Sequence, residues 1–556
     1  MANFCTLNPL YWNPIRSNSP TLSEGNLYAY GVADAMSEGS LATTTGKYYF
    51  EAHTKGDTMF GIGIPGKWGG DNPGGNDKAI ALHANGDIQC GGVIASSGVS
   101  FNDGNPHRIM IAYDHEANKI WFGVDGTWGQ SGDPANGTGG QSIPSSLHDQ
   151  QWIPAFRITN SNTDWSRLNF GQLPWIYDAP SGFSGISTEN LAEPPISNLA
   201  AEKPEDHFNV VTYTGNGGTQ SINTVGFAPD LVWAKNRTTT GYHHELYDRI
   251  RGDNLRLFSS QTPGDTTGYL QFDTDGFNLS AGGGINASGD AHVAWNWKAG
   301  GAPTATNSVG AGNVPTSGSV MIDGVASTDA LAGSIPATNI SANTTSGFSI
   351  VTFTSTGSDA TVAHGLSTPP DFITFFRRNT SGSDILVYHS ALGATKNMRL
   401  NNTDAVRTQN TFLNTEPTSS VFSIEGATFA DTRTYVAYCW SEVEGFSKMG
   451  QYTGNGNASG PFIYTGFKPS FVLIKPTTNT DQWILQDAIR DTYNPSSKRL
   501  FPNLNNAEVD GPSSYAIDFL SNGFKPVVSH SSTNQSGEAY IYMAVADSPF
   551  KYSSAR

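Results

Sequence analysis

Residues 107–126, HRIMIAYDHEANKIWFGVDG, contain two runs in which apolar and polar side chains alternate, separated by a short polar link. Alternation with a period of two is typical of a β-strand that buries one face. The runs 107–114 and 118–125 are therefore predicted to pair as a hairpin across residues 115–117. In this link His115 and Glu116 are expected to be solvated.

The residues before this hairpin show the same pattern. Short alternating runs are separated by Asn-Gly and Asp-Gly pairs, which favour tight turns between antiparallel strands. Many short strands at close spacing are typical of an antiparallel β-sandwich, predicted here for residues 1–183. The runs are GKYYFEAHT (46–54), MFGIGI (59–64) and KAIALHA (78–84), and the turn pairs are Asn85-Gly86, Asp103-Gly104 and Asp125-Gly126.

Composition supports an all-β class. The chain has 556 residues, of which only 14% are charged and 62 are glycine. It carries 48 acidic and 31 basic side chains, giving a formal net charge of −17. Such a chain repels phosphate backbones, so nucleic acid is not an expected partner.

No run of 18 apolar residues predicts a membrane span, and the first residues, MANFCTLNPLYWNP, lack the basic and apolar regions of a signal peptide. We therefore expect synthesis in a cytoplasm, without membrane insertion. The pair Tyr11-Trp12 could belong to an anchor or to the first strand of the sandwich. Three cysteines, Cys5, Cys90 and Cys439, are odd in number and widely separated, which predicts three separate thiols.

The remainder of the chain contains a repeat of about 100 residues, longer than solenoid repeats of about 20–50 residues. Five elements recur three times in the same order, so each copy is predicted to be a domain with its own interior. The predicted domains are residues 207–302, 346–446 and 447–556. The clearest elements are HFNVVTYTGNGG (207–218), GFSIVTFTSTGS (347–358) and MGQYTGNGNA (449–458); GFAPDLVWAKNR (226–237), GLSTPPDFITFFRRN (365–379) and GFKPSFVLIKPTTN (466–479); and HVAWNWKAGG (292–301), YVAYCWSEVEGF (435–446) and YIYMAVADSPF (540–550).

Two segments separate these domains. Residues 184–206 contain three prolines and are predicted to be a semi-rigid joint. Residues 303–345 carry only two charges, Asp323 and Asp329, and are rich in small polar residues. They could form a free linker, or an arm extended against a neighbouring chain, in which VMIDGVAS pairs as an edge strand.

Two motifs suggest chemistry at first sight. DTDG (273–276) resembles the start of a calcium loop, but the other copies have Glu425-Gly426 and Asn522-Gly523 there. What persists in all three copies is a small or polar residue before glycine, so a hairpin turn is predicted and no metal is expected.

His243 and His244, beside Glu245, would point to opposite faces of a strand, and copy two has only His389 in the corresponding stretch. Surface histidines are predicted.

The chain lacks the common nucleophile, zinc-protease and phosphate-loop motifs, so neither a catalytic residue nor a cofactor is predicted. The candidate binding residues are therefore polar loops that contain tryptophan, since a ring can stack on a sugar while amides and carboxylates bind its hydroxyls. The usual burial of tryptophan favours the alternative, in which each ring packs beneath its own loop. The candidates are Trp68, Asp71, Asn72, Trp128 and Asn136.

The N-terminal stretch resembles a SPRY-type domain, which is a concanavalin-like sandwich. The similarity covers roughly residues 20–178, but long Gly/Asn loops prevent a transfer of peptide-binding residues. The resemblance implies a SPRY-like sandwich followed by three related β-sandwich-type domains. Its matching pieces are GKYYFEA (46–52), FGIGI (60–64), NGDIQCGG (85–92), RIMIAYDHEANKIWFGVDGTW (108–128), WIPAF (152–156) and LNFGQLPW (168–175).

The repeats, with FSIVTFT, HGLSTPPDF and VAYCW, resemble domains of structural proteins of tailed bacteriophages, especially tail fibres. This resemblance implies a virion protein at the tail or outer particle surface, made in the host cytoplasm and released by lysis. It also implies a homo-oligomer, by analogy a trimer, that contacts other virion proteins.

The function expected from these features is multivalent attachment to a host surface glycan or protein, without enzymatic activity. A purely architectural role, in which the protein contacts only other virion proteins, is the alternative. A glycan depolymerase is less consistent with the sequence, because such spikes usually carry β-helices and no short coil repeat is present.

Overall fold

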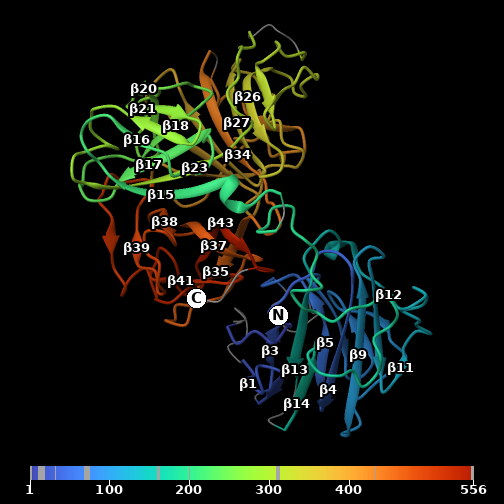
Figure 1. Ribbon diagram of the computed structural model, residues 1–556. Helices are drawn as coiled ribbons and strands as arrows, with labels where there is room; N and C mark the ends of the chain where they lie inside the picture. The colour runs from blue at the N-terminus through green and yellow to red at the C-terminus, as the bar shows by residue number, and fades with distance from the viewer. Residues whose placement is uncertain are drawn as a thin grey trace. The chain divides into compact units, whose positions relative to one another are not determined.

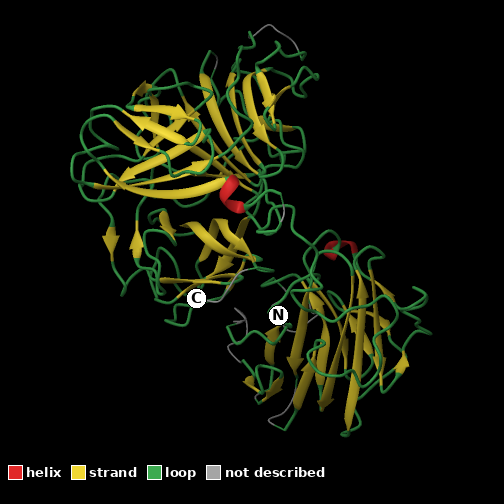
Figure 2. Ribbon diagram, in the orientation of Figure 1, coloured by secondary structure: helices red, strands yellow, loops and turns green. Residues whose placement is uncertain are grey.

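The computed structural model describes residues 3–10, 19–31, 33–67, 76–159, 163–199, 201–308, 313–430 and 432–552. The chain divides into two compact units, Met1–Glu193 with Pro461–Gly466, and Pro194–Gly460 with Phe467–Arg556. Figure 2 shows strands and loops in both units, with two short 3-10 helices, η1 (Ser145–Leu147) and η2 (Pro204–Asp206). The all-β prediction is confirmed. Among the described residues no helix has the length and apolar character needed to cross a membrane.

The first unit is built from two antiparallel sheets. One has the order β1 (Thr21–Ser23), β2 (Tyr28–Tyr30), β14 (Trp165–Asn169), β4 (Lys47–Lys55), β9 (Pro106–Asp114), β10 (Lys119–Val124) and β11 (Thr127–Trp128), with β12 (Gln141–Ser142) beside β10. The other has the order β3 (Ala35–Glu38), β13 (Ile153–Ile158), β5 (Thr58–Gly63), β6 (Ala79–His83), β7 (Asp87–Gln89) and β8 (Val93–Ser96).

The predicted hairpin is confirmed: β9 and β10 pair from Asp114↔Lys119 to Ile109↔Val124. Its link differs from the expectation, because His115 stacks on Trp152 with ring centroids 3.9 Å apart. Burial lowers the pKa of His115 to about 3. The prediction that His115 is solvated is therefore wrong, while Glu116 is exposed as predicted.

A buried carboxylate anchors an irregular segment of this unit. Glu51 in β4 is fully buried and accepts hydrogen bonds from Ile176 N at 3.1 Å, Tyr177 N at 2.8 Å and the Tyr49 hydroxyl at 3.0 Å. A buried charge is tolerated when its hydrogen bonds are satisfied. Glu51 thus holds the segment 176–177 beside the sheet, where Trp175 and Tyr177 pack against the cluster that contains Tyr49.

The second unit contains the three repeats, called here block 1, block 2 and block 3. Each block has a large sheet whose central strands are antiparallel and follow one order. Figure 1 labels many of these strands. In block 1 this sheet is β15 (Phe208–Thr214), β23 (Ala291–Trp297), β17 (Leu231–Asn236), β18 (Glu245–Asp248), β19 (Leu255–Phe258) and β20 (Thr266–Thr267). In block 2 the corresponding strands are β27 (Phe348–Thr354), β34 (Thr434–Trp440), β29 (Phe372–Arg377), β30 (Leu386–His389), β31 (Lys396–Arg399) and β32 (Arg407–Thr408). In block 3 they are β35 (Ser447–Thr453), β43 (Ala539–Pro549), β37 (Phe467–Pro476) and β38 (Ile484–Asp487), with β39 (Lys498–Arg499) paired to β40 (Val509–Asp510).

Smaller pairings complete the blocks. Block 1 has β16 (Gln220–Ile222), β22 (Gly276–Leu279) and β21 (Leu270–Asp273), block 2 has β28 (Ala360–Ala363) and β33 (Val421–Ile424), and block 3 has β41 (Ile517–Leu520) and β42 (Gly523–Pro526). The strand β36 (Ile463–Tyr464) lies in the segment grouped with the first unit. DTDG forms the turn between β21 and β22, with Asp273 paired to Gly276, as predicted.

Each large sheet buries both faces. In block 1, Val232 and Ala234 of β17 face a cluster shared with the small sheet. Leu231 and Trp233 alternate with them, and the Trp233 ring lies 6.0 Å from that of Trp295. The sequence predicted only the interior between the large and the small sheet of one block, and not the packing on the other face of the large sheet.

The second faces of the three sheets pack against one another. Trp297 of block 1 lies 6.0 Å from Trp440 of block 2 and 5.8 Å from Phe471 of block 3, measured between ring centroids. The tandem-domain prediction therefore needs a correction: the repeats have individual cores but are merged into one body through a shared aromatic core. The predicted limits of the blocks remain predictions.

Backbone hydrogen bonds join the blocks in cyclic order. Asp265 N donates to Arg378 O at 2.7 Å from block 1 to block 2, and Val406 N donates to Thr477 O at 2.8 Å from block 2 to block 3. The equivalent bond of block 3, from Glu508 N to Arg237 O at 2.8 Å, returns to block 1. A head-to-tail contact that returns to its start forms a closed ring.

Among the described residues, a connected series of arginine–carboxylate pairs reinforces two of the three contacts. Arg251 pairs with Asp248 inside block 1 and reaches Asp265 at 3.0 Å, which pairs at 3.0 Å with Arg378 of block 2. The same series recurs from block 3 to block 1.

In that second series Arg490 pairs with Asp487 at 2.5 Å and with Glu508 at 2.8 Å, and Glu508 pairs with Arg237 of block 1 at 2.8 Å. The Arg490 and Asp487 side chains are fully buried. Burial opposes ionisation of Glu508, but the two guanidinium groups hold its pKa below the usual range.

The prediction that His243 and His244 are surface histidines is wrong for His244, while His243 is half-buried with Nδ1 2.8 Å from Ser260 Oγ. His244 is fully buried, accepts a hydrogen bond from Trp233 Nε1 at 3.0 Å, and stacks on Trp295. His389, also buried, lies with Nε2 3.1 Å from Tyr542 O, so it joins block 2 to block 3. Burial lowers the pKa of His244 well below its usual value and that of His389 to about 4.

Part of the segment 303–345 forms strands of the block 2 sheet. The strand β26 (Ala337–Asn343) pairs antiparallel with β27, and β24 (Val320–Ile322) pairs parallel with β26. The strand β25 (Val325–Ala326) closes the edge, so VMIDGVAS forms an edge hairpin on its own chain. The three cysteines are free thiols, as predicted.

We predict that Arg490→Met lowers the free energy of unfolding of the second unit by about 3–5 kcal/mol, because it leaves buried Asp487 without its cation. Scanning calorimetry and urea unfolding of the full chain measure this change. The control is Lys203→Met, which removes the exposed pair Lys203–Glu205 at 3.8 Å and is expected to cost less than about 1 kcal/mol. If both substitutions lowered the free energy of unfolding equally, the ring of blocks would not depend on its buried ion pairs.

Candidate binding pocket in block 1

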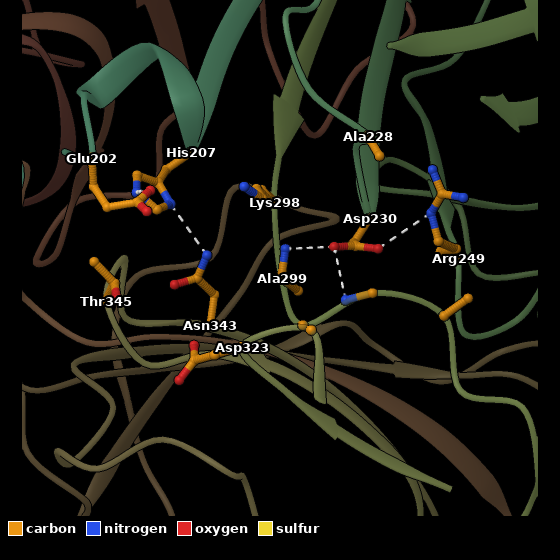
Figure 3. A pocket seen from close by; sticks show the side chains of 14 residues that line it. Glu202, His207, Ala228, Asp230, Arg249, Lys298, Ala299, Asp323, Asn343 and Thr345 are labelled. Atoms are coloured by element: carbon orange, nitrogen blue, oxygen red, sulfur yellow. Dashed lines mark hydrogen bonds and ion pairs between the residues drawn. The ribbon is translucent and has the colours of Figure 1, made fainter. Parts of the chain in front are cut away.

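A polar pocket of about 430 Å³ lies in the second unit, where block 1 meets the segment that leads into block 2 (Figure 3). Its volume falls within the range of about 300–1,000 Å³ that is usual for small-molecule sites. The lining residues are Glu202, His207, Ala228, Asp230, Arg249, Lys298, Ala299, Gly300, Gly301, Ala302, Asp323, Gly324, Asn343 and Thr345.

Asp230 lies at the start of β17 and is 2% exposed. Its Oδ2 accepts hydrogen bonds from Ala299 N at 2.7 Å and Gly301 N at 3.3 Å, and its Oδ1 lies 3.2 Å from Arg249 Nε. Burial raises the pKa of Asp230 to about 6, although Arg249 favours the charged form. Asp230 therefore holds the chain that leaves β23.

His207 forms the opposite wall and is almost completely buried. Its Nε2 lies 3.1 Å from a Glu202 carboxylate oxygen and its Nδ1 lies 3.1 Å from Asn343 Nδ2. Burial lowers the pKa of His207, which favours the neutral ring. Its carbonyl accepts a hydrogen bond from Lys298 N at 2.9 Å, so the wall is fixed to the end of β23.

Lys298 lies between these walls, as Figure 3 shows. It is half-buried, and its ammonium makes no hydrogen bond or ion pair with any other described residue. Asp323 lies at the exposed rim, where its carboxylate accepts hydrogen bonds from Thr344 N and Oγ1. Lys298 is therefore a donor available to a ligand.

The floor depends on a close approach of backbones. A Cβ on Gly300 would lie 2.4 Å from Met321 O and 2.5 Å from Ala342 O, so only glycine fits there. The segment 303–345 is thereby packed against the end of block 1, and it supplies Asp323, Asn343 and Thr345 to the pocket.

The repeats separate architectural features from features special to this pocket. In block 2 Asp371 replaces Asp230: its Oδ2 accepts a hydrogen bond from Glu442 N at 2.8 Å, and burial raises its pKa to about 6. The shifted carboxyl is thus part of the repeat architecture, which argues against a catalytic role for Asp230.

The two cations are not part of that architecture. The backbone bond of Arg249 N to Asp230 O is matched by Ser390 N to Asp371 O and by Ala488 N to Ser470 O, each 2.8 Å long. Likewise Ser441 N and Ala546 N make the bonds equivalent to that of Lys298 N, each at 2.8 Å. Serine and alanine therefore replace Arg249 and Lys298 in the other blocks.

The residues predicted from the sequence as a binding site lie in the first unit. Trp68, Asp71 and Asn72 lie outside the described residues, as does the pair Tyr11-Trp12. Trp128 is half-buried, with its ring 6.3 Å from that of Tyr49, so it packs beneath its own loop. Asn136 is exposed, and its Nδ2 donates to Asp133 Oδ2 at 2.7 Å. Their role in binding stays a prediction.

Sequence reasoning missed His207, Arg249 and Lys298. A comparison of the repeats at equivalent positions would have singled out both cations, because block 1 alone carries charge there. Within the described part of the chain, no group of three or more His, Cys, Asp or Glu side chains is arranged to hold a metal ion.

A family model described as "Domain of unknown function (DUF7483)" matches residues 203–323 and 320–549, more than half of the chain. The chain belongs to this family. Its two matched ranges contain the strands of the three blocks and every residue of the pocket lining except Glu202. No curated protein matches the sequence.

Solved structures give limited matches. Stonustoxin is 18% identical with a TM-score of 0.23, over 30% of this chain and 27% of that chain. The TRIM65 PSpry domain is 14% identical with a TM-score of 0.22, over 30% of this chain and 90% of that chain. The SPRY domain of human HERC1 is 16% identical with a TM-score of 0.22, over 28% and 94%. SPRY-type sandwiches are thus among the similar structures, and no function is carried over from them.

The raised pKa of the Asp230 carboxyl predicts that the free energy of unfolding depends on pH. The pKa of folded Asp230, about 6, lies above the usual value near 4, so its contribution to stability is complete below pH 4 and is lost as the pH rises through 6. Asp230→Asn removes this loss, and the difference in unfolding free energy between variant and wild type should change by up to about 3 kcal/mol between pH 4 and 7.

Urea unfolding at several pH values measures this difference. The matched variant is Asp371→Asn, whose carboxyl has a pKa raised to the same value and should give the same slope. If the difference in unfolding free energy between variant and wild type did not change with pH for either variant, the raised pKa values of Asp230 and Asp371 would be contradicted.

Proposed function

We propose that the protein is a virion component of a tailed bacteriophage, a tail fibre or similar appendage that binds the host cell surface. The resemblance of the repeats to phage structural domains supports a place in the virion. The closed ring of blocks supports a rigid, load-bearing role. Binding without chemical turnover is supported by the pocket, whose shifted carboxyl recurs in block 2 as a structural clamp.

The observation that carries the binding role is the ammonium of Lys298. It lies in a polar pocket without a hydrogen bond or ion pair to another described residue, and the repeats show that the fold does not need a lysine at this position. A donor that the architecture does not require is available for a ligand.

Attachment by such a pocket needs several copies. A single polar site is weak, but linked sites that engage together gain about 10²–10⁴ in avidity. We propose a homotrimer, in which three copies of the pocket face a repetitive host surface glycan or protein, with other virion proteins at the attached end.

We predict that the labelled full-length protein binds in a saturable way to bacterial strains that the phage infects and not to receptor-deficient resistant derivatives. Flow cytometry measures the bound protein, and an excess of unlabelled protein is expected to displace it. Light scattering on the same sample measures the oligomer.

Equal binding to susceptible and resistant cells would contradict attachment. Absence of binding to both, together with labelling of particles by an antibody to the chain, would favour the architectural role. Release of reducing sugar from host envelopes would contradict the absence of enzymatic activity.

A further inference from the structure

We propose that the block 1 pocket binds a single polyhydroxylated unit, a sugar ring, held by direct hydrogen bonds without aromatic stacking. This inference names the ligand class for the pocket and so deepens the proposed function, on which it rests for its biological meaning. The chemistry of the pocket is independent of the particle.

The lining selects against other ligand classes. Its apolar members are only alanine and glycine, so an apolar ligand would gain little and would leave Lys298 without a partner. The lining carries charges of both signs, so an anion attracted by Lys298 also meets the carboxylates of Glu202 and Asp323, and a cation attracted by them also meets Lys298. Repulsion therefore offsets attraction for a ligand with a net charge of either sign.

A hydroxyl group suits this mixture because it both donates and accepts hydrogen bonds. Lys298 can donate to one hydroxyl, and the carboxylates of Glu202 and Asp323 can accept from others. Neighbouring hydroxyls on a ring therefore satisfy both signs of charge, with no net charge on the ligand.

The other blocks provide an internal comparison. At the equivalent place in block 2 Ser441 is 1% exposed, and Glu442 beside it pairs at 2.7 Å with Lys448, at the start of block 3, so the cation there is neutralised by a carboxylate of the protein itself. In block 1 the residue equivalent to Glu442 is Ala299, which removes the internal carboxylate and leaves space. The pocket is open in block 1 because its side chains differ from those of block 2, while the backbone is the same.

The test is saturation-transfer-difference NMR of the full chain with D-glucose, D-galactose and N-acetyl-D-glucosamine, with inorganic phosphate and a simple alkylammonium ion as competitors. We expect transfer to at least one sugar, a dissociation constant in the millimolar range, and no displacement by either ion. Lys298→Ala should weaken that binding at least ten-fold.

The matched control is Lys396→Ala, which removes a half-buried lysine of β31 in block 2 and should leave sugar binding unchanged. Lys298→Gln, which keeps a donor, should bind with intermediate affinity. Thermal unfolding midpoints within about 2 °C of wild type verify that the variants are folded.

No transfer to any of the sugars, displacement by phosphate, or equal binding by wild type and Lys298→Ala would each overturn the inference. The cell-binding experiment fails separately. If cells bind the Lys298→Ala variant as well as wild type, attachment stands and the pocket assignment falls; if sugars bind but cells do not, the reverse holds.

Discussion

The second unit depends on charges that are buried where one block meets the next. Asp248 with Arg251, and Asp487 with Arg490, have fully buried side chains, and each carboxylate also accepts a bond from a neighbouring block, from the Tyr438 hydroxyl at 2.7 Å and from Trp295 Nε1 at 3.0 Å. A buried ion pair adds little net stability, but separating it is costly. The blocks therefore cannot part without exposing both these charges and the shared aromatic core, and this constraint fixes their cyclic order.

The three contacts of the ring are not equally reinforced, and the difference follows the course of the chain. Between blocks 2 and 3 His389 replaces the aspartate, and its bond to Tyr542 O replaces the ionic series. These blocks are also joined by the short link between β34 and β35, which keeps them at high effective concentration. Blocks 3 and 1 have no covalent connection at their contact, and blocks 1 and 2 are joined by the long segment 303–345. The ionic series occurs at the two contacts that the chain itself constrains least.

The sequence predicted local structure well because local structure depends on neighbours along the chain. The alternation in 107–125 gives the hairpin of β9 and β10, and turn chemistry locates the turn between β21 and β22. The burial of His244 and His389 could not be predicted. In a strand where apolar and polar residues alternate, the face that carries the polar residues is normally exposed to solvent. Here the exposed face of one block is the interior of the ring. The pocket escaped prediction for a related reason: it forms only when the segment 303–345 folds back on the end of β23, a contact that no local pattern encodes.

Repetition also explains how a site arises in one block without loss of the fold. The clamp made by Asp230 and Asp371 ties each departing chain to its sheet, so a carboxylate at this position is retained for structure in both blocks. The backbone bonds made at the neighbouring positions 249 and 298 are 2.8–2.9 Å long whether the residue is arginine, lysine, serine or alanine, and block 1 adds the ion pair between Arg249 and Asp230. The side chains at these positions differ between the blocks, although Arg249 follows Asp248 and Lys298 follows Trp297, two residues through which block 1 contacts its neighbours. The fold therefore permits a pocket beside a structural carboxylate, and block 1 alone places the cations Arg249 and Lys298 there.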